Sequence, residues 1–253
     1  MDTGFVKTET NDKGLAVITF GHPAHNSLPS PLLAQLSEHI RTAGAETAVK
    51  LILLQSAGDR TFCAGASFDE LLALTDEKAG KAFFSGFAHV INAIRRSPKL
   101  IIGRAQGKAV GGGVGLMAAC DYCFASENAA VKLSEISINI GPFVIAPALK
   151  RKIGLSAFTA LSLNPTTFFD AQWAQQQGLI HSVQATVSEM DTAIEAFCDL
   201  LLNKNLEALT ALKRTLWEGT DHWEILLHDL AAISGRLALS EESKQSLYEF
   251  KQR

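Results

Sequence analysis

From Gly14 to Ser126 the chain alternates short apolar runs with longer amphipathic stretches. Continuous apolar runs of this length are typical of strands buried on both faces of a parallel sheet. The predicted strands are Gly14–Phe20, Leu51–Leu54, Leu100–Ile102 and Tyr122–Ala125. Between them, apolar residues recur at helical spacing, and proline marks a helix start at Pro31 and a helix end at Pro98. This alternation predicts an α/β layered domain.

The pattern changes after the middle of the chain. From about Ser188 onward, successive amphipathic helices are separated by polar or glycine residues, and no strand pattern returns. The sequence therefore predicts a β-rich α/β core over residues 1–195 and a helical C-terminal segment over residues 196–253.

Composition excludes several classes of protein. The 253 residues are 47% hydrophobic and 19% charged, which suits a globular protein with a sizeable core. The net charge of −3 provides no general attraction to nucleic acid or to an anionic membrane. The uncharged stretches are too short to span a bilayer, and the N-terminus lacks a targeting pattern, so a cytoplasmic protein is expected. Four scattered cysteines are too few for a disulfide scaffold, and the histidines and cysteines show no metal-binding spacing.

A glycine cluster at Gly111–Gly113 and Gly115 opens a predicted helix. Glycines expose backbone N–H groups without side-chain cover, and at a helix N-terminus such groups bind anions or oxyanions. Close helix–strand packing is the structural alternative. A phosphate-binding P-loop does not fit, because Ala109 stands where a Ser or Thr would hold magnesium. A dinucleotide site is disfavoured because its glycines should follow a strand directly.

A second turn of small residues, Cys63–Ser67, also ends at a helix N-terminus, where Ser67 and Glu70 form a predicted capping box. Two N–H groups from separate turns that converge on one oxygen make an oxyanion hole. The two turns therefore predict a site for a carbonyl oxygen that becomes negatively charged.

Glu135 follows a short apolar run and precedes fourteen uncharged residues. A carboxylate in such surroundings is partly desolvated, which raises its pKa and suits it to proton transfer. A buried salt bridge is the structural alternative. The pair Cys120 and Cys123 has no second pair nearby, so these cysteines are interpreted as small buried hydrophobic residues.

Taken together, these blocks resemble the enoyl-CoA hydratase/isomerase (crotonase) superfamily. The matching blocks run in the family's order over nearly the whole chain: 23–28 (PAHNSL), 62–71 (FCAGASFDEL), 107–116 (GKAVGGGVGL), 119–126 (ACDYCFAS), 134–136 (SEI) and 171–179 (AQWAQQQGL). The resemblance implies a ββα spiral core with a helical C-terminal segment that covers the site and mediates assembly into trimers or paired trimers. It also implies an acyl-CoA thioester substrate whose carbonyl oxygen is held by the N–H groups of Ala66 and Gly112.

The resemblance implies further substrate-binding residues. The segments Pro23–Leu28 and Ala64–Phe68 would lie against the adenine and pantetheine of coenzyme A, which enters as part of the substrate and not as a separate cofactor. Four aromatic side chains either shape the acyl pocket or fill the core: Phe83, Phe84, Phe87 and Phe143. For the first three, the core is the preferred interpretation. The residues assigned to substrate are Ala24, Asn26, Ala64, Gly65, Ser67, Phe68, Gly111, Gly113, Phe143 and Lys251, the last as a contact to a CoA phosphate.

One departure from the family pattern bears on the reaction. Family hydratases use two glutamates; the second is present as Glu135, but the first position holds Gly115. Moving a double bond needs one group that takes a proton from C2 and returns it at C4. The sequence therefore favours Δ3,Δ2-enoyl-CoA isomerisation over hydration, and Pro142-Phe143 resembles the one-glutamate isomerases.

Two other functions remain open. One is hydration, including that of branched methylglutaconyl-type substrates, if Asp69, Glu70, His89 or Asn139 positions the water. The other is a non-catalytic acyl-CoA-binding or RNA-binding relative. Retention of Glu135 argues for chemistry, and the net charge of −3 argues against RNA.

Overall fold

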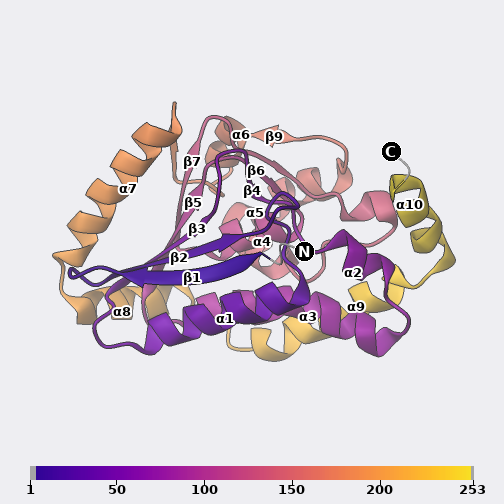
Figure 1. The fold of residues 1–253 in the computed structure, drawn as a ribbon, viewed down its shortest axis with the longest axis horizontal. Helices are drawn as coiled ribbons and strands as arrows, with labels where there is room; N and C mark the ends of the chain where they lie inside the picture. Colours follow the sequence, from indigo (N-terminus) through magenta and orange to yellow (C-terminus); the bar gives the residue numbers. More distant parts are fainter. Residues whose placement is uncertain (1–3, 252–253) are drawn as a thin grey trace.

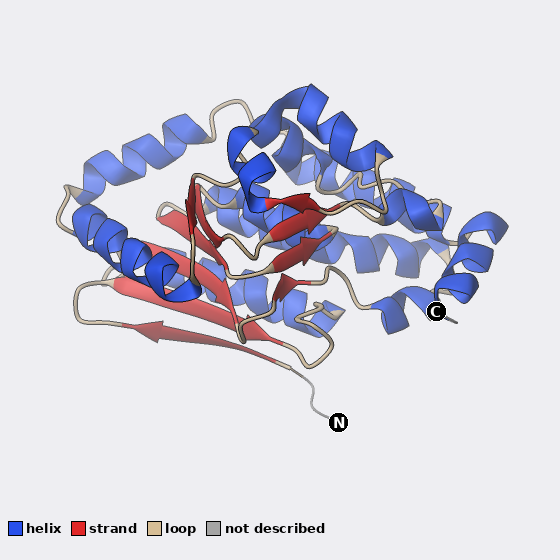
Figure 2. Ribbon diagram, turned by 90° about the horizontal axis from the view of Figure 1, so that it is seen from above, coloured by secondary structure: helices blue, strands red, loops and turns tan. Residues whose placement is uncertain are grey.

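The computed structural model describes residues 4–251, apart from the side chains of residues 250 and 251, and contains two mixed β-sheets (Figures 1 and 2). The larger sheet has the order β1-β2-β3-β5-β7-β10, in which only the β1–β2 pair is antiparallel. Its strands are β1 (Phe5–Thr10), β2 (Leu15–Gly21), β3 (Leu51–Ser56), β5 (Leu100–Ala105), β7 (Tyr122–Ser126) and β10 (Ser182–Gln184).

The smaller sheet has the order β4-β6-β8-β9, and its short strands carry the turns from which the site is built. Only β8 and β9 pair antiparallel in it. Its strands are β4 (Thr61–Cys63), β6 (Lys108–Val110), β8 (Ala130–Lys132) and β9 (Phe169–Asp170). The predicted α/β class is thereby confirmed. The sequence pattern missed β1, an edge strand whose residues are mostly exposed or half-buried and so lack a continuous apolar run.

Six helices belong to the α/β body. They are α1 (Ser30–Ala45), α2 (Phe68–Leu72), α3 (Glu77–Arg96), α4 (Gly112–Ala119), α5 (Ala146–Leu163) and α6 (Ala171–Gln176), with a short 3₁₀ helix η1 at Glu135–Ile138. α1 begins at Ser30 with Pro31 in its first turn, and α3 ends two residues before Pro98, as the proline positions predict. α4 is buried over most of its length because glycine and alanine allow its neighbours to approach closely.

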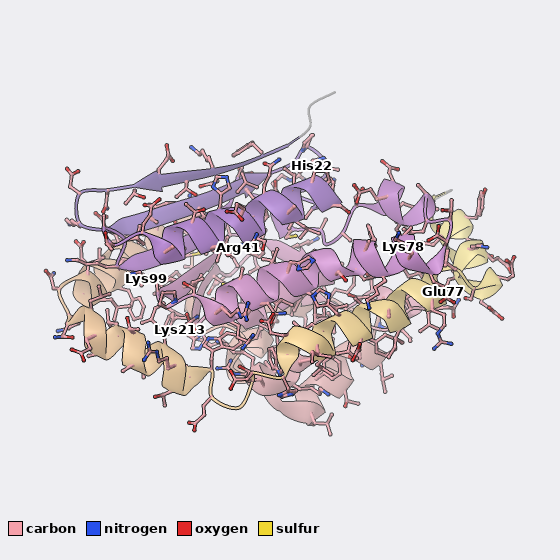
Figure 3. All side chains as sticks on the ribbon, turned by 90° about the horizontal axis from the view of Figure 1, so that it is seen from below. His22, Arg41, Glu77, Lys78, Lys99 and Lys213 are labelled. Atoms are coloured by element: carbon pink, nitrogen blue, oxygen red, sulfur yellow. The ribbon has the colours of Figure 1, made fainter. Side chains whose placement is uncertain are left out.

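Four helices complete the described chain: α7 (Val187–Leu202), α8 (Leu206–Leu216), α9 (Trp223–Ala238) and α10 (Glu241–Lys251). The last strand, β10, ends at Gln184, and α7 runs through the boundary drawn at residue 195. Figure 1 shows α7 and α10 at opposite ends of the molecule. In Figure 3, α1, α3 and α9 lie side by side. No helix among residues 4–251 is long and apolar enough to cross a bilayer.

A buried ion pair between Lys213 and Asp121 links α8 to the core. Lys213, labelled in Figure 3, comes from α8, and its Nζ lies 2.7 Å from a carboxylate oxygen of Asp121 at the start of β7. The same carboxylate accepts hydrogen bonds from Trp217 Nε1 and from the Ile101 N–H, both at 2.7 Å. The two charged side chains are 2–3% exposed, so the C-terminal helices are attached through a fully satisfied polar network.

Candidate active site

A cavity of about 790 Å³ lies between the two glycine-containing turns and the C-terminal helices. It is lined by residues of the 22–28 and 64–71 segments, α3, the start of α4, the 132–145 segment, α9 and α10. The C-terminal helical segment therefore contributes part of the cavity wall, through Ser234, Ser246 and Glu249.

A backbone hydrogen bond and a close approach at Gly65 position the second turn. The Leu28 N–H donates to Gly65 O at 2.8 Å, which holds the second turn against the 22–28 segment. Gly65 has a φ of +92°, a conformation that favours glycine, and a Cβ at this position would lie 3.0 Å from Val110 O and 3.6 Å from the Gly112 nitrogen. Only a residue without a side chain permits this approach of the Ala66 turn to the start of α4.

The Ala66 and Gly112 N–H groups have no acceptor elsewhere in the described chain. Both residues are partly exposed and line the cavity, whereas Gly111 and Gly113 beside Gly112 are buried. Gly112 is the first residue of α4, so the helix dipole adds to its N–H. Two such donors are suited to a single oxyanion.

Glu135, at the start of η1, lies beside these donors. A Cβ on Gly111 would be only 2.8 Å from Glu135 Oε1. The other carboxylate oxygen, Oε2, is buried and has no hydrogen-bond partner. Burial raises the pKa of Glu135 to about 7, and hydrogen bonds from the Glu135 and Ser134 backbone partly offset this rise. The salt-bridge alternative is wrong, because Glu135 has no cationic partner among the described residues.

An apolar side chain fills the volume beside Gly115. A Cβ on Gly115 would lie 2.3 Å from Ile145 Cγ2 and 2.8 Å from Ile145 Cβ. Ile145 is buried and lines the cavity. Family hydratases carry their first glutamate at the position of Gly115. In this protein the Ile145 side chain occupies the space that a side chain at that position would need.

Most residues assigned to substrate from the sequence line this one cavity. They are Ala24, Ala64, Gly65, Ala66, Ser67, Phe68, Gly111, Gly112, Glu135 and Phe143. Phe83, Phe84 and Phe87 line it as well, while Phe83 and Phe87 are also buried in the core. These rings therefore line the cavity, and two of them also belong to the core.

Asn26 and Gly113, which were also assigned to substrate, do not line the cavity. The Asn26 amide donates to Ala57 O and Thr61 O, both at 2.8 Å, and its oxygen accepts from the His22 N–H, so the side chain supports the loop. Gly113 is buried because a Cβ there would lie 2.5 Å from Cys63 O. Lys251 belongs to α10, but its side chain lies outside the described residues.

The capping box at α2 is only half formed. Ser67 Oγ accepts from the Glu70 N–H at 3.3 Å, as predicted. The Glu70 carboxylate instead accepts from the Ser30 N–H and Oγ, at 2.9 and 2.7 Å, and so caps α1. A pattern local in sequence could not reveal this partner forty residues away.

Of the four side chains considered for positioning water, only Asp69 lines the cavity. The His89 ring packs against the His228 ring on α9 in a tilted arrangement, with 4.9 Å between ring centroids. Asn139 donates to Glu242 O and Ser246 Oγ. Sequence reasoning missed several other lining side chains, among them His22 and His25 in the 22–28 segment and Ser234 on α9. The sequence does not reveal that Ser234 belongs to the site, because it is a single small residue on α9. The helix against which α9 packs, α3, lies far away in the sequence.

A model of the enoyl-CoA hydratase/isomerase family matches residues 10–253. The chain belongs to this family. It is therefore a crotonase-family enzyme that acts on acyl-CoA thioesters, as its sequence motifs predict. Ala66, Gly112 and Glu135 occupy the positions that the resemblance assigns to the oxyanion donors and to the acid.

The similar proteins span several members of the family. A probable enoyl-CoA hydratase of Bacillus subtilis (strain 168) is 26% identical over 241 residues, which cover 94% of this chain and 93% of that protein. The mitochondrial methylglutaconyl-CoA hydratase of Mus musculus is 31% identical over 194 residues, which cover 76% of this chain and 61% of that protein. The structure of an enoyl-CoA hydratase from Bacillus halodurans superposes with a TM-score of 0.90 at 25% identity, covering 97% of this chain and 99% of that one. The crotonase-type fold is confirmed.

Proposed function

We propose that this enzyme transfers a proton at C2 of an enoyl-CoA thioester, with Glu135 as its acid–base group. The observation that carries the proposal is the Glu135 Oε2 atom, which is buried without a partner in the cavity that also holds the Ala66 and Gly112 amides. An unpartnered carboxylate oxygen is costly unless a substrate group engages it. Its pKa of about 7 is suited to taking up and releasing a proton near neutral pH.

The proposed chemistry proceeds through an enolate. As a proton leaves C2, negative charge moves onto the thioester oxygen, where the Ala66 and Gly112 N–H groups donate hydrogen bonds to it. In enzymes from which one such donor has been removed, the activation barrier rises by about 2.7–4 kcal/mol. The turns at 22–28 and 64–68 would hold the pantetheine and adenine of the CoA, with Lys251 at a phosphate.

The geometry favours isomerisation of a 3-enoyl-CoA to a 2-enoyl-CoA. Glu135 takes the C2 proton, the double bond moves from C3–C4 to C2–C3, and the same carboxyl returns a proton at C4. This reaction needs one acid–base group, and the Ile145 side chain closes the place where a second acid would start.

The relatives favour hydration instead. Most of them are named as hydratases, including methylglutaconyl-CoA hydratases, although a peroxisomal Δ(3,5)-Δ(2,4)-dienoyl-CoA isomerase of Arabidopsis thaliana is also similar, at 22% identity over 224 residues. By relatedness, hydration is the better supported reaction. In it, Glu135 would activate water for addition at C3, and the proton would reach C2 of the enolate, with Asp69 at the cavity rim as the remaining candidate to orient the water.

Parallel assays of purified protein separate the two reactions. Straight-chain 3-enoyl-CoA, straight-chain 2-enoyl-CoA and 3-methylglutaconyl-CoA are each supplied, and products are followed by chromatography. Conversion of the 3-enoyl to the 2-enoyl ester at rates far above hydration supports isomerisation; the opposite ratio establishes hydration. A CoA ester that raises the melting temperature while no substrate yields product would instead indicate the binding-only alternative.

We also propose that the chain assembles into trimers or paired trimers. Large apolar side chains are exposed on helices that surround the core, namely Leu155 and Leu163 on α5, Leu212 and Leu216 on α8, and Ile225 on α9. Exposed apolar groups of this kind mark interaction surfaces when they gather in patches. Light scattering after size-exclusion chromatography tests this proposal, and a monomer at micromolar concentration contradicts it.

A further inference from the structure

Only two buried side-chain oxygens lack a hydrogen-bond partner in the described residues, and both belong to residues that line the same cavity. One is Glu135 Oε2, which the proposed function assigns to the proton at C2. The other is Ser234 Oγ, on α9, a residue that is 1% exposed. Buried polar groups are almost always paired, so the second orphaned oxygen needs its own explanation.

Ser234 interrupts an apolar face of its helix. Leu227, Ala231 and Ala238 are buried at helical spacing on α9, and Ser234 stands among them. A serine inside a helix commonly bonds a carbonyl one turn earlier, but Ser234 makes no such bond. Its hydroxyl therefore has no partner among the described residues, and Ser234 is one of the residues that line the cavity.

The surroundings of Ser234 correspond to the acyl end of the site. The neighbouring α3 contributes Phe83, Phe84 and Phe87 to the cavity, and α9 crosses α3 so closely that a Cβ on Gly235 would lie 2.5 Å from Gly80 C. These aromatic rings suit a hydrocarbon chain. The CoA moiety and the thioester are assigned to the other wall, made by the 22–28 and 64–68 turns.

We propose that Ser234 is a specificity-determining residue that hydrogen-bonds an uncharged oxygen, a hydroxyl or a carbonyl, on the acyl chain beyond the reacting carbons. This rests on the proposed acyl-CoA function and narrows its substrate class to oxygen-bearing acyl groups. An uncharged group is favoured over a carboxylate because the described side chains that α3, α9 and α10 bring to the cavity include Glu249 and no cation. The lysine that lines the cavity, Lys132, belongs to β8. A site with an unpaired buried hydroxyl discriminates against chains that cannot pair with it.

Binding of saturated acyl-CoA esters tests this without requiring turnover. Isothermal calorimetry compares esters from butanoyl- to octanoyl-CoA with their counterparts hydroxylated at the last or next-to-last carbon, and with ω-carboxylated counterparts. We expect at least one hydroxylated ester to bind about tenfold more tightly than its plain partner. We expect Ser234→Ala to abolish this ratio by tightening the plain ester and weakening the hydroxylated one.

Ser85→Ala is the matched control, because Ser85 is a buried serine on the adjoining helix that bonds His228 and does not line the cavity. It should lower the melting temperature and leave the binding ratio unchanged, whereas Ser234→Ala should raise the melting temperature. The proposal is overturned if no hydroxylated ester is preferred, if only the carboxylated esters are, or if the preference survives in Ser234→Ala. Ester binding with no turnover of any enoyl-CoA would reject the proposed reaction and leave this comparison intact.

Discussion

The surroundings of Glu135 set the pKa of its carboxyl group. Its carboxylate is buried beside Gly111, and desolvation raises its pKa to about 7. The same burial places it in the cavity with the Ala66 and Gly112 amides. A carboxylate on the surface would stay ionised and would be a weak base at neutral pH.

Replacement of this acid tests its role. Glu135→Gln keeps the shape of the side chain but cannot carry the proton, so turnover should fall by about 10²–10⁴-fold. The dissociation constant of a saturated acyl-CoA should change little, because the amides and the CoA turns are untouched. Initial rates and calorimetry measure the two effects. Wild-type turnover in the variant would exclude proton transfer by Glu135.

The pKa of Glu135 also makes a prediction about pH. As a base it must be ionised, so kcat/KM should rise with pH and level off above about 7.

The contribution of Glu135 to the free energy of unfolding should change with pH in the opposite direction. The folded pKa lies above the ordinary value of 4.5, so the stabilising contribution is present below that value and is lost as pH rises through about 7. The melting temperature of Glu135→Gln relative to wild type should therefore increase between about pH 5 and pH 8. A constant difference across this range would contradict the raised pKa.

Gly115 and Ile145 together should govern whether a second acid can act. Gly115→Glu alone places a Cβ 2.3 Å from Ile145 Cγ2, and such overpacking destabilises by about 1–3 kcal/mol. Adding Ile145→Gly should restore stability and raise the rate of 2-enoyl-CoA hydration. Ile145→Gly alone is the control for the cavity that this change creates. No gain in hydration by the folded double variant would show that the missing acid is not limiting.

At the scale of elements, the crossing of α3 and α9 shapes the acyl side of the cavity. Gly80 and Gly235 meet at this crossing, and the backbone of each helix occupies the place of a Cβ on the other. Ser234 and Phe83 lie next to the crossing in the chain, on the two helices that it joins. Small residues at this point therefore set how near the two walls lie.

Gly235→Ala should push the helices apart. The new Cβ would lie 2.5 Å from Gly80 C and Lys81 N, which are backbone atoms that cannot rotate away. We expect a loss of about 1–3 kcal/mol in urea unfolding and weaker binding of acyl-CoA esters. Gly44→Ala in α1 is the comparison, since its Cβ meets only the Ser97 hydroxyl within 3.4 Å. Equal effects from both substitutions would show that the crossing is not tightly packed.

At the scale of the whole molecule, the buried network around Asp121 joins the C-terminal helices to the sheet. Asp121→Asn preserves the volume but leaves the Lys213 ammonium buried without a countercharge. Removal of one partner of a buried pair costs about 3–5 kcal/mol. Asp199→Asn, which breaks the exposed pair with Lys13, should cost about 1 kcal/mol or less. Chemical denaturation compares the two, and similar small losses would show that Asp121 does not fasten the helices.

Much of this protein could be predicted from local patterns. The β2, β3, β5 and β7 strands follow from continuous apolar runs, because a strand buried on both faces needs an apolar residue at every position. The two turns that we propose as the oxyanion site follow from their glycines, and the raised pKa of Glu135 follows from its uncharged neighbours in sequence. These are properties that a short segment carries with it wherever it folds.

Tertiary structure alone decided the rest, because those features depend on residues far apart in the chain. Glu70 caps α1 rather than its own helix, and the Asn26 amide supports a loop rather than a ligand. The closure of the Gly115 position by Ile145 and the isolation of the Ser234 hydroxyl follow from which helices pack together. Sequence determines which groups can react or bond; packing determines which of them are left without a partner and so available to a substrate.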